Sequence, residues 1–450
     1  MLSRQQKEAV FLLQIGTFLE YFDLMLFVHM AVILNELFFP KVDPFTSSLL
    51  SAFAFCSTFV LKPFGALLFG YIGDKVGRKH TIIMTTMLMS LSCIIMATVP
   101  TYAQIGITAS WVITICRGLQ GMSSVGETIG AELYIAEMIK PPSRYPAVAF
   151  IGFAGVVGMV VALLVARVVI GLEINWRVIF VIGALIALIG SAARVKLRES
   201  PEFSDATRKM RIAIQNSQES GLSKASDLLS SLKIKTNAEV CKKTSFAYFA
   251  VCCGWPFCFY FSYVYCGGIL KEQFGYTKEA LINHNLILAA CNLLGLFGFI
   301  WLTKMIHPLK ILQAKLMIYL PFICIVPWLI LSSHSVFMIF IIQFFGIVLG
   351  NSIIPAKGVF IMHFPIFKRF RYAGVLVAVS HAVLYIVTSF GLVFLVKYFT
   401  YYGILLISIP TTVCFLFGIR YFIKLEKEVG NYPLEGELQV RPKEEMFDEI

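Results

Sequence analysis

Charged and amide side chains lie inside segments of the chain that are otherwise strongly apolar. Glu20 and Asp23 interrupt one such segment, and on a helix they would lie roughly 60° apart on one face. A second segment carries a polar stripe that falls within roughly 100° of the helical wheel and consists of Arg117, Gln120, Ser124, Glu127 and Tyr134. A cation and carboxylates at different depths could bind a solute carboxylate, or transfer a proton, in successive steps across the membrane.

A structural explanation accounts for the same stripe. Arg117 could form an ion pair with a carboxylate and lock two helices together, and such a pair could also act as a gate. Lys62, next to Pro63 in another apolar segment, is a further charged candidate. Aromatic side chains between residues 257 and 265 could stack on a cationic or planar solute, although packing in the core or against lipid explains them as well.

The composition indicates the environment of these residues. Of 450 residues, 58% are hydrophobic and only 14% are charged, and the mean hydropathy is +0.79. So little polar surface cannot cover a soluble protein of this length. The net charge of +12 resides in short connectors, so it indicates membrane topology and no nucleic-acid partner. The 11 cysteines are scattered without metal-ligand spacing, so we expect no metal.

Twelve segments are long and apolar enough to cross a hydrocarbon core, which takes roughly 20 residues per helix. They cover residues 10–33, 48–71, 80–99, 105–130, 146–170, 177–195, 244–268, 281–303, 309–331, 335–358, 373–396 and 402–423. An even number of spans places both termini on one side, and most Lys and Arg residues of the connectors lie on that side. The positive-inside rule therefore predicts a multi-pass protein of the cytoplasmic (inner) membrane with both termini in the cytoplasm.

A long polar connector divides the spans six plus six. We expect an N-terminal six-helix bundle over residues 1–195, a cytoplasmic linker over 196–243, a C-terminal six-helix bundle over 244–424 and a cytoplasmic tail over 425–450. The predicted fold is an all-α membrane protein with twelve transmembrane helices in two six-helix bundles. Such bundles could rock around a midplane site, although a polar insertion without mechanical meaning would give the same division.

The loop GYIGDKVGRKH follows the second predicted span. It contains Gly70, Asp74, Gly77, Arg78 and Lys79 in the pattern GxxxDxxGRK, and it resembles the signature loop between helices two and three of the major facilitator superfamily. The resemblance implies a gating clasp, in which Asp74 caps a helix end and pairs with basic groups across the bundle interface, and to which Arg78 and Lys79 belong. The glycines permit the tight turn and the close helix approach that a clasp requires.

Other segments resemble the metabolite:proton symporter branch of that superfamily, which includes proline/betaine, α-ketoglutarate and citrate carriers. The similar segments are GTFLEYFDLMLF from residue 16, LKPFGALLFGYIGDKVGRK from residue 61 and RGLQGMSSVGETIGAELYIAE from residue 117. On this resemblance, Arg117 and Gln120 form the proton-linked motif of the fourth helix. Glu20, Asp23 and Glu127 are then the carboxylates that couple protons or contact the substrate.

Two features depart from that branch. Lys62 stands where Arg is usual, which keeps the charge but loses the bidentate fork. The second-half copy of the loop, WLTKMIHPLK, has neither an Asp nor a GR pair, so a C-terminal clasp is absent or differently built. In the fifth span, Gly152, Gly155 and Gly158 predict tight packing, and the absence of the antiporter Gly-Pro favours symport.

We therefore expect a proton-coupled symporter that imports a small organic solute, such as a proline/betaine-type zwitterion or an organic acid, by alternating access. Its expected partners are the solute, protons and the bilayer, and we expect a monomer without a cofactor. A proton-independent facilitator or exporter is the alternative, favoured by the eroded second-half loop. A membrane-embedded enzyme or receptor finds little support, because the sequence shows no nucleophile–base pair, metal-ligand spacing or phosphate loop.

Overall fold

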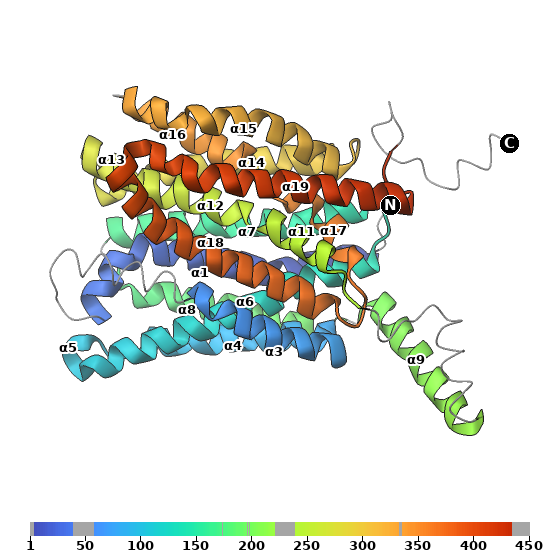
Figure 1. Ribbon diagram of the computed structural model, residues 1–450. Coiled ribbons are helices and arrows are strands. Elements are labelled where there is room, and N and C mark those ends of the chain that lie inside the picture. Colours follow the sequence, from blue (N-terminus) through green and yellow to red (C-terminus); the bar gives the residue numbers. More distant parts are fainter. Residues whose placement is uncertain are drawn as a thin grey trace.

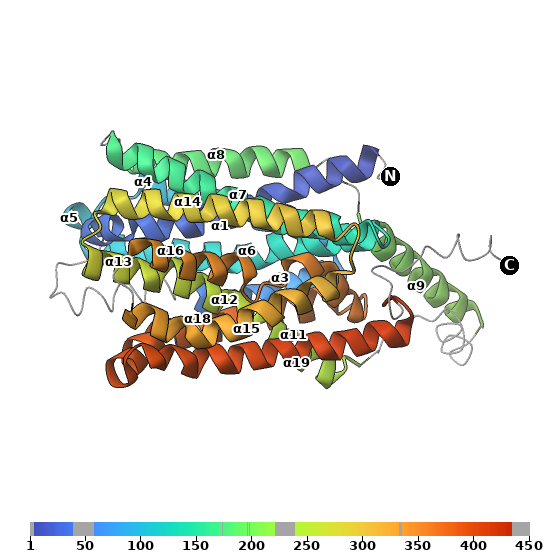
Figure 2. The same ribbon diagram turned by 90° about the horizontal axis from the view of Figure 1, so that it is seen from above.

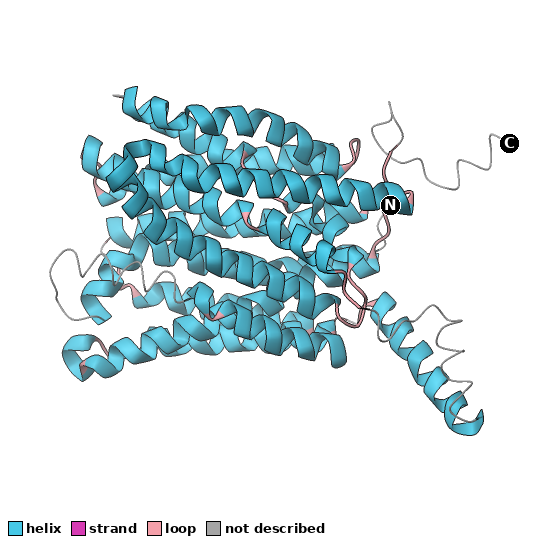
Figure 3. Cartoon of the chain, viewed as in Figure 1, coloured by secondary structure: helices cyan, strands magenta, loops and turns pink. Residues whose placement is uncertain are grey.

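The fold is that of a bundle of long helices. The computed structural model describes residues 4–38, 58–172, 174–195, 197, 199–220, 239–332 and 335–433, and all regular structure within them is helical (Figure 3). Nine continuous helical stretches of these described residues are long and apolar enough to cross a membrane, as a hydrocarbon core about 30 Å thick requires. The long helices lie side by side (Figure 1).

The first half of the chain supplies the first six predicted spans, and residues 48–57 of the second one lie outside the described part. The helices are α1 (Arg4–Phe38), α3 (Lys62–Lys75), α4 (Arg78–Thr98), α6 (Ile107–Met138), α7 (Arg144–Gly171) and α8 (Arg177–Arg194), with a short α5 (Tyr102–Ile105) before α6. The α6 helix is not among the nine apolar stretches, because it carries the polar stripe.

The second half supplies the other six spans, and two of them are interrupted. The seventh consists of α11 (Lys242–Cys252), α12 (Gly254–Phe259), a π-helical turn η1 (Tyr260–Tyr265) and α13 (Cys266–Phe274). The tenth consists of α16 (Val336–Phe344), a π-helical turn η2 (Phe345–Leu349), the 3₁₀ turns η3 (Ile354–Ala356) and η4 (Ile361–His363), and α17 (Lys357–Phe360) between them. The uninterrupted spans are α14 (Lys278–Leu302), α15 (Pro308–Ser332), α18 (Arg369–Phe399) and, after η5 (Thr400–Ile404), α19 (Leu405–Val429). Such π-helical turns often occur at functional sites.

Small residues set how closely the helices approach one another. The α1 and α7 helices pack along much of their length, and a Cβ on Gly158 would lie 2.2 Å from the carbonyl oxygen of Phe18. Only glycine fits there, since no side chain tolerates that distance. Gly155 meets Tyr21 and Gly152 meets Ile354 of the second half, so the tight packing predicted for the fifth span is confirmed.

Helices far apart in sequence form the contact between the two halves. The α3 helix lies along α18, and α7 lies along α14. The beginning of α1 and the end of α19 lie at the same end of the bundle (Figures 1 and 2), here called the terminal face. An additional helix, α9 (Pro201–Ser220), projects from this face, within the segment predicted as a linker.

Candidate functional site

Glu20 and Asp23 of α1 each pair with a cation on a neighbouring helix. Nζ of Lys62 lies 2.6 Å from Oε1 of Glu20, and the other carboxylate oxygen of Glu20 accepts a hydrogen bond from Thr128. Pro63 in the first turn of α3 favours a helix start at this point. Lys62 is therefore buried at the beginning of α3, beside α1.

Arg117 and Gln120 of α6 hold Asp23 of α1. The Arg117 guanidinium pairs with Asp23 and also donates to Oε1 of Gln120 at 3.0 Å. The Gln120 amide in turn donates to Oδ1 of Asp23 at 3.2 Å. Because both oxygens of Asp23 have partners on α6, the carboxylate can lie at a membrane depth where an unpaired charge would be costly.

A small cavity lies among these pairs, at the junction of α1, α3 and α6. It is lined by Glu20, Asp23, Leu24, Thr58, Phe59, Lys62, Met89, Arg117, Gln120 and Ser124. The structure thus brings together five of the six predicted pathway residues, namely Glu20, Asp23, Lys62, Arg117 and Gln120. Within the described residues, no group of His, Cys, Asp and Glu side chains is arranged to hold a metal ion.

Aromatic side chains of the second half pack behind Phe59, which lines this cavity. The ring of Tyr385 in α18 lies 4.0 Å from the ring of Phe59, measured between centroids, and Phe59 also contacts the Lys62 ammonium. Phe259 of the interrupted seventh span packs against Tyr385 at 6.3 Å. By contrast, Phe257 belongs to a cluster within the second half, so only part of the predicted aromatic group faces the first half.

Glu127 lies apart from the cavity, although it belongs to the same stripe as Arg117. Its carboxylate is 3.8 Å from the guanidinium of Arg194 at the end of α8, and both side chains are about 1% exposed. Gly16 of α1 makes room for it, because a Cβ there would lie 2.4 Å from Oε2 of Glu127. The predicted stripe therefore divides between two partners, α1 for Arg117 and α8 for Glu127.

A further buried ion pair joins the two halves. Nζ of Lys357 in α17 lies 2.5 Å from Oε1 of Glu132 in α6. No role was predicted from the sequence for these two residues or for Arg194. Their only signal in the sequence is a charge within an apolar run, and nothing in the sequence indicates which charges meet.

Asp74 caps the first turn of a helix from the other half. Its two carboxylate oxygens accept hydrogen bonds from the backbone N–H groups of Phe370 and Arg371, each at 3.0 Å. These N–H groups belong to the beginning of α18, where a carboxylate is stabilised by the positive end of the helix dipole. Gly70 allows this approach, because a Cβ on it would lie 2.6 Å from Cα of Arg371.

Arg78 and Arg369, one from each half, bind the same carboxylate. Arg78 donates to both oxygens of Glu137, at 3.2 and 2.9 Å, and Arg369 donates to Oε1 of Glu137 at 3.1 Å. Gly77 makes the turn before Arg78 with a φ of 126°, which glycine adopts readily. For Lys79 the structure shows a backbone N–H donation to Glu199 at 3.3 Å. We call Asp74, Arg78, Glu137 and Arg369 the clasp.

The second-half copy of the loop is built differently. His307 lies between α14 and α15 and is 1% exposed. Its ring packs edge-on against Tyr145 of α7 and Tyr432 after α19, with centroid distances of 5.5 and 5.2 Å. Burial lowers the pKa of His307 to about 4, so the ring is neutral near pH 7. In this second-half loop, the described contacts of the His307 ring are aromatic, whereas the first-half loop forms the charged clasp.

A family model described as Major Facilitator Superfamily matches residues 11–392. The chain belongs to the major facilitator superfamily. It is therefore a multi-pass membrane protein of a family of transporters.

Curated relatives within the superfamily are transport proteins of bacteria. The chain is 30% identical over 211 residues to a proline/betaine transporter of Salmonella typhimurium, covering 45% of this chain and 42% of that protein. It is 35% identical over 197 residues to the inner membrane metabolite transport protein YhjE of Escherichia coli, covering 42% and 45%. The chain thus matches less than half the length of these relatives. The predicted family resemblance is confirmed.

Solved structures show the fold over nearly the whole chain. The proton:xylose symporter XylE bound to 6-bromo-6-deoxy-D-glucose superimposes with a TM-score of 0.76, covering 94% of this chain and 97% of that one, at 16% sequence identity. The human organic anion transporter MFSD10 gives a TM-score of 0.61 at 15% identity, with 94% and 100% covered. The predicted major facilitator fold is therefore confirmed.

Proposed function

We propose that this transporter is a proton-coupled symporter that imports a small organic solute with a carboxylate, such as a proline/betaine-type zwitterion or an organic acid. The observation that carries the proposal is the arrangement of Arg117, Asp23 and Gln120 beside a cavity at the junction of α1, α3 and α6. The proline/betaine relatives give the solute class its support.

Coupling follows from the pairing of the charges. While Asp23 is ionised, it occupies the Arg117 guanidinium. A proton on Asp23 removes the charge of the carboxylate and leaves the guanidinium to a solute carboxylate, which Arg can bind in a bidentate manner. Proton and solute then load together, and Glu20 with Lys62 provides a second pair that a proton would loosen in the same way.

The moving units are proposed to be the N-terminal bundle, residues 1–195, and the C-terminal bundle, residues 244–424, joined by the linker and followed by the tail from residue 425. The contacts between α3 and α18 and between α7 and α14 would be exchanged as the bundles rock. With cytoplasmic termini, the clasp closes the cytoplasmic face.

The test is proton movement in proteoliposomes under an imposed pH gradient. The purified protein is challenged with zwitterions, mono-, di- and tricarboxylates, and sugars. We expect proton entry that depends on one class of carboxylate-bearing solute. Uptake of a solute without proton movement would contradict symport and favour a proton-independent facilitator or exporter, for which the lack of a charged clasp around His307 gives a structural argument.

A further inference from the structure

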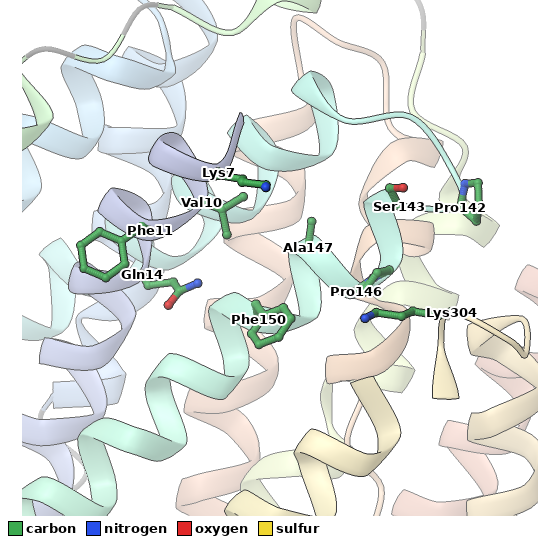
Figure 4. Close-up of a pocket in the computed structure, with 10 residues that line it drawn as sticks. All are labelled: Lys7, Val10, Phe11, Gln14, Pro142, Ser143, Pro146, Ala147, Phe150 and Lys304. Carbon is green, nitrogen blue, oxygen red and sulfur yellow. The ribbon is translucent and has the colours of Figure 1, made fainter. Parts of the chain in front are cut away.

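A cavity of about 620 Å³ opens near the terminal face, away from the proposed solute site. It lies between the first turns of α1, the first turns of α7 and the loop that follows α14 (Figure 4). This cavity is far larger than the one beside Arg117. The proposed symport does not use it.

The walls of the cavity are apolar apart from a few side chains. Its apolar lining includes Val10 and Phe11 of α1 and Ala147 and Phe150 of α7 (Figure 4). Phe11 is 69% exposed, which in a soluble protein would be an unfavourable position for so large an apolar side chain. An apolar occupant would cover this ring.

Two lysines supply the charge of the cavity. Lys7 reaches in from α1 and Lys304 from the loop after α14, with their ammonium groups toward the cavity (Figure 4). Both residues are exposed, no residue that lines the cavity is acidic, and among the described residues neither lysine is part of an ion pair. The cavity therefore complements an anion.

The depth of the cavity identifies the kind of anion. The apolar stretch of α1 begins at Gln6, that of α7 begins at Arg144 and that of α14 ends at Leu302. Lys7 and Lys304 therefore lie where the hydrocarbon region meets the head groups, and the apolar walls extend from them toward the hydrocarbon. A head-group phosphate with an acyl chain attached matches this combination of charge and depth.

We propose that this cavity binds one anionic phospholipid, with its phosphate between Lys7 and Lys304 and an acyl chain along Val10, Phe11 and Phe150. Lys7 belongs to the first half of the chain and Lys304 to the second. The bound lipid would therefore contact both halves at the face where the clasp also joins them. The inference rests on membrane insertion and does not depend on the solute or on proton coupling.

The test is a competition between phosphatidylglycerol and phosphatidylcholine with identical acyl chains, both added to the purified full-length protein. Native mass spectrometry counts the lipids of each kind that remain bound. The variant K7Q/K304Q is compared with K209Q/K424Q, which removes the same charge from exposed lysines of α9 and α19. We expect the wild type and K209Q/K424Q to retain phosphatidylglycerol preferentially. In K7Q/K304Q this preference should fall about fivefold for each lysine removed, which is about 25-fold in total.

A photoreactive phosphatidylglycerol distinguishes a defined site from general attraction to a basic face. Cross-links are expected in peptides that contain residues 7–14 and 143–150, and they should be lost in K7Q/K304Q. Equal retention of the two lipids by the wild type would overturn the proposal. So would equal behaviour of the two double variants, or cross-links spread over the lipid-facing helices.

Discussion

Arg117 has two partners that respond differently to a proton. Asp23 loses its charge when it is protonated, whereas Gln120 stays a neutral acceptor and keeps the guanidinium in place. Substitution of Arg117 by Ala removes the cation and leaves Asp23 buried without its charged partner, which costs about 3–5 kcal/mol for a buried pair. We expect uptake to fall at least about 100-fold, measured as solute flux into proteoliposomes.

The matched control for this variant is Arg117→Lys, which retains the charge but not the fork. It should recover part of the uptake, and the amount of Arg117→Ala in the membrane should equal that of the wild type. Normal transport by Arg117→Ala would show that the solute site lies elsewhere.

The pair between Glu132 and Lys357 is suited to a charge exchange. Lys357→Met leaves the Glu132 carboxylate buried alone, since that side chain is about 1% exposed, and should lower both the unfolding temperature and uptake. The exchanged variant E132K/K357E restores a pair of opposite charges. It should recover part of the lost stability, measured by thermal unfolding of the purified protein, and no recovery would contradict a direct pair.

At the scale of helices, the cap of α18 comes from the other half of the chain. Asp74→Asn keeps one acceptor for the N–H groups of Phe370 and Arg371 but removes the charge that favours the helix end, a loss of about 1 kcal/mol. The closed terminal face becomes about fivefold less populated. We expect slower turnover with solute binding retained, measured as transport and as equilibrium binding of the same solute.

The control for this variant is Asp205→Asn, which removes a carboxylate from the exposed α9 helix. It should transport like the wild type. An unchanged turnover in Asp74→Asn would show that the cap does not limit the transport cycle.

The buried loop around His307 predicts a pH dependence of stability. Burial lowers the pKa of His307 from 6.5 to about 4, so below about pH 6.5 the unfolded chain binds a proton that the folded protein excludes. Stability is therefore lost as the pH falls from about 6.5 toward 4, by about 2 kcal/mol at pH 5. His307→Phe should reduce this acid-side loss, measured by thermal unfolding at pH 7.5 and pH 5.

Phe can keep the ring contacts with Tyr145 and Tyr432 and cannot be protonated. Substitution of the exposed His80 by Gln is the control and should leave the acid-side loss unchanged. Equal losses in the wild type and His307→Phe would contradict a buried neutral His307.

How much of the fold and of the site could be predicted from the sequence depends on whether the interactions that determine them are local or join distant segments. Hydropathy predicts the spans, because a helix that crosses lipid satisfies its own backbone and needs only length. The spacing of Glu20 and Asp23, and that of Arg117 and Gln120, predicted a polar face on each of two helices, since residues three apart lie on one helical face. That these two faces meet at one junction could not be predicted from the spacing. The pairing of Glu127 with Arg194 depends on how α6 and α8 each pack against α1 and α4, and that packing is not encoded in either helix alone.

For the whole molecule, the segment between the halves combines two roles. Residues near its beginning contact the clasp, because Ser200 donates to Glu137 at 2.6 Å and Glu202 pairs with Arg369 at 3.3 Å. We expect that the chain expressed as two polypeptides, 1–220 and 239–450, assembles and transports. A first polypeptide that ends at residue 197 should transport less, because these contacts are lost, and uptake in cells measures the difference. Equal uptake with the first polypeptides ending at residues 220 and 197 would show that the segment only connects the two halves.

The clasp also has a consequence in time. Arg369 follows its partner Glu137 by 232 residues, and a ribosome that adds roughly 5–20 residues per second needs roughly 10–50 seconds to make that stretch. During this interval Glu137 can pair with Arg78 of its own half, but the N–H groups that Asp74 binds do not yet exist. The pair of Arg78 with Glu137 can therefore form early, whereas Arg369 and the backbone N–H partners of Asp74 arrive only when the eleventh span is synthesised.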